Sequence, residues 1–231
     1  MSDTGIESLI KKGKPAAPSK FIIMGDPMTG KTTLAAKAPK ALFVSTDGNA
    51  AKAGLDAIDA DSLKVVKQSI DYFVNSDYET LVIDTIEGIA DLFEKTVIDN
   101  YQLETGQSIT ALTDVPYGKL TGQFNRRMAA FAETLWLIPK NVMILTYTKR
   151  QVDDVSGSIV LASELKSIRQ FTRFSDGIIL TSYDGERYRA QVVSKRTVMA
   201  GEVVYGSIEP FLRAASWELP AKKTKVGTTK K

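Results

Sequence analysis

Eight consecutive residues near the start of the chain have the types and spacing of a phosphate-binding loop. Gly25 to Thr32 read G-D-P-M-T-G-K-T, a full match to the Walker A pattern G-x-x-x-x-G-K-[ST], and they follow the apolar run 21–24, which we expect to be a buried strand. In such a loop the glycines let successive backbone N–H groups approach a phosphate closely, and the positive end of the next helix adds to the attraction. An ordinary glycine-rich turn would not require Lys31 and Thr32 at its end.

The loop predicts ATP and Mg²⁺ as cofactors. We expect Lys31 to reach the β- and γ-phosphates and the Thr32 hydroxyl to hold Mg²⁺. The predicted nucleotide-binding residues are Gly25, Asp26, Pro27, Met28, Thr29, Gly30, Lys31, Thr32 and Thr33. No motif for a particular base is readable, so ATP is the default nucleotide.

A site of this kind needs a second acid, the Walker B residue, at the end of a neighbouring strand, where it orients the metal and its waters. Residues 81–84 read L-V-I-D, an apolar run that ends in an acid. We therefore predict that Asp84 takes part in Mg²⁺ binding and catalysis. Asp84 could also cap the helix expected to start at Ile86, and one residue can do both.

Phosphoryl transfer to water also requires a carboxylate that positions the attacking water. Asp47 is the candidate, because it follows the expected strand 42–45. The alternative is that Thr46-Asp47-Gly48-Asn49 only forms a turn before the next helix.

The composition narrows the possible chemistry. The 231 residues include neither cysteine nor histidine, which excludes disulfides, thiolate metal sites and histidine bases. Catalysis must rest on carboxylates, Lys, Arg and a bound metal. The length and the hydrophobic content of 43% predict one well-buried domain.

Three segments are expected along the chain. Residues 1–19 form a flexible N-terminal segment whose apolar Ile6, Leu9 and Ile10 could hook onto another subunit, 20–215 form the ATPase domain, and 216–231 form a basic tail. The tail holds five lysines, and the net charge of the whole chain is only +3, so the tail is what makes the chain basic. It either solubilises the protein or makes a weak, salt-sensitive contact with nucleic acid. No apolar stretch approaches a membrane span, which predicts no membrane contact and a cytoplasmic protein, in the host cell if it is phage-encoded.

Short apolar runs alternate with helical patterns through the domain. Strands are expected at 21–24, 41–45, 80–83, 142–146 and 177–181, and helices at 31–38, 86–102, 118–138 and 50–58. This alternation predicts an α/β fold with a mostly parallel sheet flanked by helices. Near the end, runs at 178–182 and 187–194 around Asp184-Gly185 predict an antiparallel hairpin, which a third run at 201–208 could extend.

Together these motifs resemble the RecA-like P-loop ATPases, and more closely the compact phage-encoded ones associated with single-strand annealing and recombination. The resemblance covers about residues 20–208. It implies a RecA-like core and a homo-oligomer, as a ring or a filament, that binds single-stranded DNA and has a single-strand-binding protein as a companion. It also supports Asp47 as the water-positioning acid, although relatives usually have Glu there, and the pair Asp84-Thr85 matches the family.

The resemblance also implies two DNA-binding segments. The first lies between 114 and the strand at 141–146, and the second between 149 and 170. Their basic residues are Arg126, Arg127, Lys149, Arg150, Lys166 and Arg169. A solvated surface connection is the alternative for the second segment.

Two further roles follow from the same resemblance. At the end of the strand at 142–146 relatives carry a polar residue that senses the γ-phosphate, and Thr148 would serve here. Relatives also insert basic residues into the neighbouring subunit's site, where Lys195 and Arg196 would act, one of the two at most because adjacent strand residues face opposite ways.

The resulting hypothesis is a DNA-stimulated ATPase that acts in recombination or annealing. A helicase or helicase loader is the alternative with the same core, since a fold does not determine a function. A switch or scaffold that binds ATP with little turnover is another, motivated by Asp47 and Thr148. A small-molecule kinase shares the loop, but the chain shows no arginine-rich lid.

Overall fold

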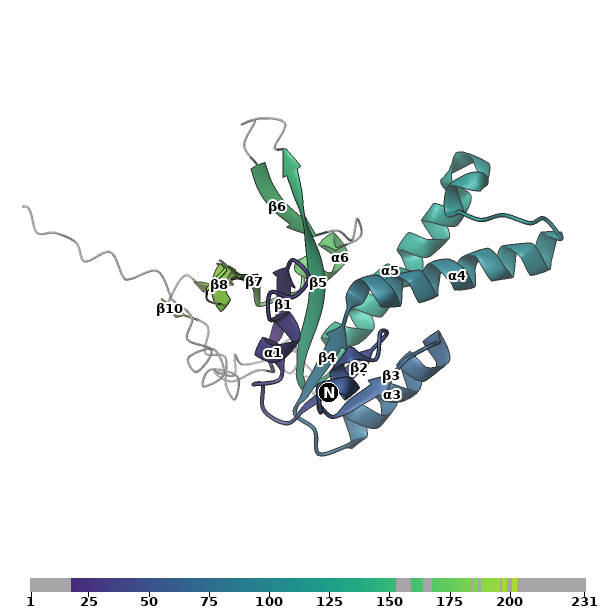
Figure 1. Ribbon diagram of the computed structural model, residues 1–231. Helices are drawn as coiled ribbons and strands as arrows, with labels where there is room; N and C mark the ends of the chain where they lie inside the picture. The colour runs from purple at the N-terminus through teal and green to yellow at the C-terminus, as the bar shows by residue number, and fades with distance from the viewer. Residues whose placement is uncertain are drawn as a thin grey trace, which may run out of the picture.

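A computed structural model of the protein describes residues 18–152, 159–163, 168–183, 185–186, 188–195, 197–198 and 201–202. Within this part, an eight-stranded sheet runs in the order β3-β2-β4-β5-β1-β7-β8, with β6 paired to β5 (Figure 1). Neighbouring strands in the series β3, β2, β4, β5, β1 and β7 are parallel. Strand β8 is antiparallel to β7, and β6 is antiparallel to β5. Since the strands with parallel neighbours all end at one edge, loops that follow them meet there.

The strands are β1 (Lys20–Gly25), β2 (Ala41–Ser45), β3 (Ala57–Asp59), β4 (Thr80–Asp84), β5 (Asn141–Val152), β6 (Ile159–Ser163), β7 (Gly177–Tyr183), β8 (Tyr188–Lys195), β9 (Thr197–Val198) and β10 (Gly201–Glu202). The α-helices are α1 (Lys31–Ala35), α2 (Asn49–Lys52), α3 (Leu63–Asn75), α4 (Ile86–Thr105), α5 (Lys119–Leu137) and α6 (Arg169–Thr172). Short 3₁₀ turns lie at Leu112–Asp114 and Pro116–Gly118.

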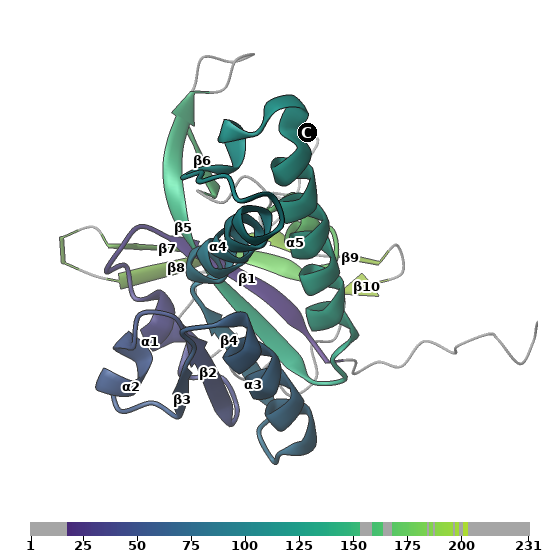
Figure 2. The same cartoon turned by 90° about the vertical axis from the view of Figure 1, so that its right-hand side faces the viewer.

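Helices cover both faces of the sheet, as the alternating direction of strand side chains requires. On one face, Ile22 of β1 and Ile144 of β5 pack with residues of α3, α4, α5 and α6. On the other, Phe21 and Ile23 pack with residues of α1 and α2. Figure 2 shows α1 and α2 apart from the layer formed by α3, α4 and α5. The near-continuous apolar strands are therefore buried from both sides.

Two parts of the molecule extend beyond the sheet. Helices α4 and α5 run side by side away from it (Figure 1), and their outer ends share a separate cluster of Val97, Leu112, Val115 and Leu120. The other part is the β5–β6 arm, in which β5 continues past the sheet and residues 148–152 pair with 159–163. Because β5 lies between β4 and β1, one strand joins the centre of the sheet to this arm.

The predicted fold class is confirmed, including the β7–β8 hairpin. The helix predicted at 50–58 is wrong beyond its first turn: α2 ends at Lys52, Gly54 adopts a left-handed φ of 76°, and the chain returns as β3 beside β2. The prediction overlooked α3, whose N-cap Ser62 accepts a hydrogen bond from the Val65 N–H. Residues 201–202 pair with β9 rather than with the hairpin, and 203–208 lie outside the described residues.

In the part of the chain that the structure describes, no helix has the length and apolar character needed to cross a membrane.

Candidate nucleotide-binding site

The phosphate loop connects β1 to α1 at the edge where the parallel strands end. Gly30 has a φ of 86°, in the left-handed region that glycine tolerates, and α1 begins at the next residue. Gly25 is also required sterically, because a Cβ there would lie 2.2 Å from Thr181 Oγ1 and 2.4 Å from Thr29 Oγ1. These two hydroxyls hydrogen-bond to each other at 2.9 Å and tie the loop to β7.

The predicted phosphate ligand Lys31 is folded back onto its own loop. Its side chain is buried, and Nζ donates to the carbonyls of Gly25 and Asp26 at 2.9 Å each. Nζ also lies 4.4 Å from the ring centroid of Tyr147, within the range of a cation–π contact. A triphosphate offers charge-assisted hydrogen bonds that would replace these contacts.

Thr32 and Asp84 lie together, as the sequence predicted. The Thr32 hydroxyl donates to Asp84 Oδ2 at 2.8 Å, and Asp84 is buried at the end of β4. Burial raises the pKa of Asp84, and the nearby carboxylates of Asp47 and Glu87 raise it further, whereas the Thr32 hydrogen bond and Lys31 lower it. A hydroxyl and a carboxylate in contact are oxygen donors of the type that Mg²⁺ takes beside phosphate oxygens and waters, so the residues fit the ion. A bound cation would offset the carboxylate charge in this buried position.

Asp47 reaches the same edge through strand pairing. Ser45, the last residue of β2, pairs with Asp84, so Asp47 follows just beyond it. Its carboxylate accepts hydrogen bonds from Ser45 Oγ at 2.9 Å, from the Asn49 N–H at 2.9 Å and from Asn49 Nδ2 at 2.6 Å. Partial burial raises the pKa of Asp47, but these hydrogen bonds outweigh it and leave the pKa below its usual value. The turn interpretation therefore holds, and the exposed carboxylate also lines the pocket.

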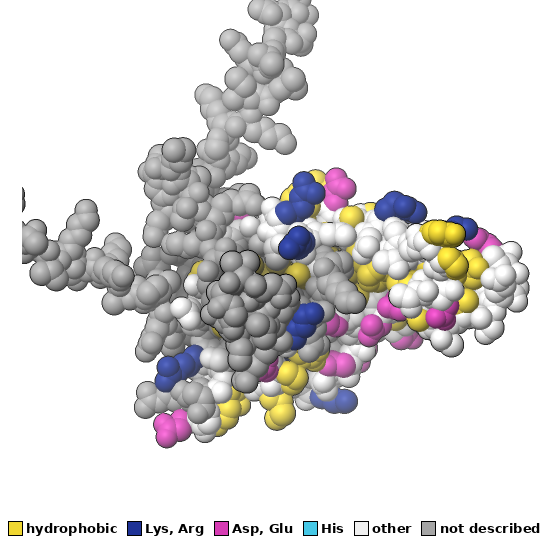
Figure 3. Space-filling model, turned by 90° about the horizontal axis from the view of Figure 1, so that it is seen from above, with side chains coloured by type: hydrophobic (Ala, Val, Ile, Leu, Met, Phe, Trp, Pro, Cys, Tyr) yellow, Lys and Arg dark blue, Asp and Glu magenta, His cyan; other side chains and the backbone are white. Residues whose placement is uncertain are grey.

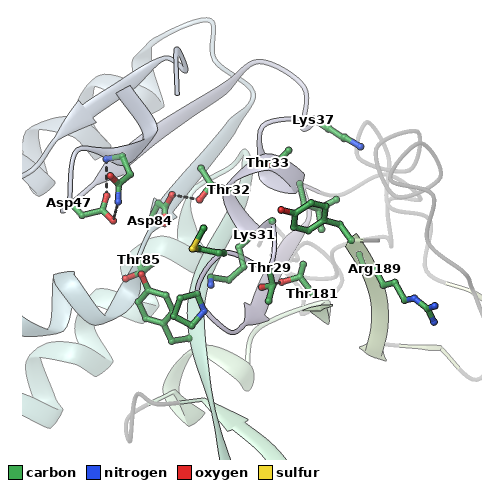
Figure 4. A pocket seen from close by; sticks show the side chains of 18 residues that line it. Thr29, Lys31, Thr32, Thr33, Lys37, Asp47, Asp84, Thr85, Thr181 and Arg189 are labelled. Carbon is green, nitrogen blue, oxygen red and sulfur yellow. Dashed lines mark hydrogen bonds between the residues drawn. The ribbon is translucent and has the colours of Figure 1, made fainter. Parts of the chain in front are cut away.

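These residues surround a cavity of about 810 Å³, a size suited to a nucleotide. Figure 4 shows Lys31 and Thr32 between Asp47 and Asp84 on one side and Thr181 and Arg189 on the other. The wall combines the loop, α1, the ends of β2 and β4, the middle of β5, one residue of β7 and the start of β8. Its described residues are Pro27, Met28, Thr29, Gly30, Lys31, Thr32, Thr33, Leu34, Lys37, Asp47, Asn49, Asp84, Thr85, Tyr147, Thr181, Tyr188, Arg189 and Ala190.

The part of β5 that lies level with the phosphate loop differs in detail from the prediction of a threonine sensor. The side chain in the pocket is that of Tyr147, whereas the Thr148 hydroxyl donates to the carboxylate of Asp26 in the phosphate loop. Thr148 thus contacts the loop from outside the cavity wall. Both residues connect β5 directly to the predicted phosphate-binding residues.

Glu87, in the first turn of α4, is a site residue that the sequence did not predict. Its Oε1 accepts a hydrogen bond from the Thr146 hydroxyl and another from the Tyr147 N–H at 3.1 Å. Burial raises the pKa of Glu87, although these hydrogen bonds oppose the increase. Its Oε2 is buried without a hydrogen-bond partner among the described residues. The only available signal was an acid three residues after Asp84, which is common at helix starts.

The predicted DNA-binding residues are distributed over several elements. Arg126 and Arg127 are exposed on α5, and Lys149 and Arg169 are exposed on β5 and α6. Arg150 lies on β5, but its side chain is not described, and Lys166 falls outside the described residues. On the face shown in Figure 3, basic side chains are scattered rather than gathered in one patch.

The backbone of Lys195, one of the two predicted finger residues, lies away from the chain's own cavity. Lys195 pairs with Gly177, which in turn pairs with Phe21, four residues before Gly25. At about 3.3 Å per residue, this places the Lys195 backbone about 13 Å below the phosphate loop. Its side chain is not described, and Arg196 lies outside the described residues.

Residues 17–202, more than half of the chain, match the model of a family described as an AAA domain. The chain belongs to this AAA-domain family. Its phosphate loop and mostly parallel sheet are those of a P-loop nucleotide-binding domain, a class of domain that generally uses ATP and Mg²⁺.

No curated protein sequence matches this AAA-domain chain. Among solved structures, it is similar to a KaiC-like protein from the hyperthermophilic archaeon Pyrococcus horikoshii, at 14% identity and a TM-score of 0.45, over 79% of this chain and 82% of that one. It is also similar to the RadB recombinase, at 14% identity and a TM-score of 0.44, over 81% of this chain and 86% of that one.

Proposed function

We propose that this AAA-domain protein is a DNA-stimulated ATPase that binds single-stranded DNA and acts as a homo-oligomer in recombination or annealing. One observation carries the proposal: β5 passes from the nucleotide cavity directly into the β5–β6 arm. Tyr147 and Thr148 contact Lys31 and Asp26, and the next residue, Lys149, is exposed on the arm. A change at the phosphate loop would therefore be transmitted along one strand to the exposed Lys149 of the arm.

The chemistry follows from the residues at the sheet edge. Lys31 and the loop N–H groups would bind the β- and γ-phosphates, and Thr32 with Asp84 would hold Mg²⁺. Bound Mg²⁺ neutralises charge that develops on the phosphate oxygens. Asp47 would orient the attacking water, for which its lowered pKa keeps the carboxylate ionised.

We propose an oligomer because a second subunit could supply a further basic residue to the nucleotide site. The backbone position of Lys195 is too far down the sheet for it to serve its own cavity, so a finger from Lys195 or Arg196 would have to act in the neighbour's site. The predicted N-terminal hook and a companion single-strand-binding protein belong to this proposal as well. Sedimentation of the chain with and without residues 1–14 tests the hook: unchanged assembly would remove it.

DNA binding would use phosphate contacts with little sequence preference. The test is steady-state ATP hydrolysis at low salt with and without single-stranded DNA, in the wild type and in Lys149→Ala. Arg127→Ala removes an exposed basic residue of the other predicted DNA segment, on α5. Comparison of the two variants shows which segment contacts DNA. Equal turnover with and without DNA would contradict the proposal. Strand displacement on a forked duplex would instead identify the helicase alternative.

A nucleotide-dependent switch with little turnover is the second candidate. The observation that favours it is the three hydrogen bonds that hold the short Asp47 side chain in its turn, since a water-positioning acid needs a free lone pair aimed at the water. Measurable turnover that is lost in Asp47→Ala would exclude this candidate. Tight ATP binding without turnover would support it.

A further inference from the structure

The β7–β8 hairpin holds two stacked tyrosines at its tip. Tyr183 and Tyr188 face each other across the strands, with ring centroids 4.7 Å apart and an interplanar angle of 32°. The Tyr183 hydroxyl donates to the Gly185 carbonyl at 2.7 Å, which fixes its ring against the turn. Both rings remain exposed, Tyr183 at 49% and Tyr188 at 67% of their surface. Two exposed, fixed aromatic rings offer a flat apolar face to a ligand.

This aromatic pair lies next to the phosphate loop. Gly25 pairs with Thr181, so the tyrosines stand two residues beyond the level at which β1 enters the loop. Tyr188 lines the nucleotide cavity, and its Cδ1 is 3.3 Å from the position that a Cβ on Gly30 would take. Tyr188 therefore lies beside the glycine that precedes Lys31.

The position of the pair relative to the acids gives the direction of the ligand. Asp47 and Asp84 lie on one side of Lys31, and Arg189, the neighbour of Tyr188 in β8, lies on the other (Figure 4). A triphosphate with its terminal phosphate toward the acids would extend its remaining part past Thr33 toward the hairpin. That part of a nucleotide is the sugar and the base.

We propose that Tyr188 is the platform on which the nucleobase stacks, with Tyr183 supporting it from behind. The inference rests on the proposed binding of ATP and adds the part of the site that holds the base. Stacking uses the face that every base presents, and a purine offers more of it than a pyrimidine. Affinity should therefore follow the area of the base, in the order purine above pyrimidine above no base.

The experiment separates the base from the phosphates by comparing two probes. Calorimetric titration of the full chain with ATP and with inorganic tripolyphosphate, both with Mg²⁺, is carried out on wild type, Tyr188→Ala and Tyr188→Phe. Tyr188→Ala should weaken ATP binding about tenfold and leave tripolyphosphate binding within about twofold. Tyr188→Phe keeps the ring and should bind both probes as the wild type does.

Other outcomes overturn the proposal in distinguishable ways. Equal losses for both probes in Tyr188→Ala, or no loss for either, would mean that the ring does not hold the base. A wild type that binds ATP no more tightly than tripolyphosphate would lead to the same conclusion. Failure of the wild type to bind either probe would instead refute nucleotide binding itself. Because Tyr188 is mostly exposed, its truncation should leave the fold intact, which an unchanged thermal unfolding curve checks.

Discussion

Gly88 allows the helix that follows Asp84 to approach the turn that carries Asp47. A Cβ on Gly88 would lie 2.0 Å from Thr46 Oγ1 and 2.7 Å from Thr46 Cβ. Contacts this short cannot be relieved by rotating the hydroxyl alone, because the Thr46 Cβ is attached to the backbone. Gly88→Ala must therefore displace either α4 or the turn, and both position acids of the site.

The magnitude follows from comparing this clash with the usual effect of alanine in a helix. Alanine is favoured over glycine by about 1 kcal/mol in a helix interior, whereas overpacking of a fixed neighbour costs about 1–3 kcal/mol. Gly88→Ala should therefore destabilise the protein by up to about 2 kcal/mol. Gly122→Ala in α5 is the matched control, since its nearest atom would be the flexible Arg126 Nη1 at 3.8 Å; it should stabilise by about 0.5–1 kcal/mol.

The assay is urea unfolding of wild type and both variants, followed by ATP hydrolysis under native conditions. Opposite shifts of the midpoint at constant slope are expected, with reduced turnover in Gly88→Ala only. Midpoints that move in the same direction in the two variants would refute the close approach of α4 to the Thr46 turn.

Three other predictions concern individual contacts. Asp84→Asn should reduce Mg²⁺-dependent turnover by about a hundredfold or more while ATP still binds in EDTA, and a smaller decrease would remove Asp84 from the metal site. Tyr147→Ala should lower the DNA stimulation of turnover more than the basal rate, whereas equal decreases would mean that Tyr147 only shapes the cavity. Burial lowers the pKa of Lys20 from 10.5 to about 8, although the negative charge of Asp176 opposes this shift. Between these two pH values the Lys20 amine is protonated in the unfolded chain and has lost its proton in the folded protein. From pH 8 to pH 10 the wild type should therefore gain about 2 kcal/mol of unfolding free energy relative to Lys20→Met, and parallel pH profiles would contradict this.

The two Walker motifs were predictable because each is local. The glycine spacing, Lys31 and Thr32 lie within one turn, and Asp84 ends an apolar strand, so a short stretch of sequence carries each signal. Their meeting follows from the parallel sheet, in which β2 and β4 pair and bring Ser45 level with Asp84. A known strand type was enough to infer that common edge.

The remaining site residues depend on contacts that no local pattern contains. Glu87 meets Tyr147 across 60 positions, and Thr29 meets Thr181 across 152. Tyr188 reaches Gly30 only because β7 pairs with β1 and the hairpin returns over it. A tyrosine at the start of a strand is otherwise indistinguishable from any other strand aromatic.

The helix predicted at 50–58 shows a different kind of error. Its alanine and leucine spacing suits a helix, but Gly54 at a φ of 76° turns the chain, and pairing of β3 with β2 outweighs local propensity. For α3 the signal was present, since Val66, Ile70 and Phe73 recur at helical spacing after Ser62. That helix could have been predicted.

The central claim is that β5 couples the nucleotide cavity to a DNA-binding surface. The most direct measurement is the affinity for fluorescent single-stranded DNA with and without a non-hydrolysable ATP analogue, in the wild type and in Lys31→Ala. Coupling between sites is reciprocal, so the analogue should tighten DNA binding by about tenfold in the wild type and leave Lys31→Ala unchanged. Equal DNA affinity of the wild type with and without the analogue would contradict the account.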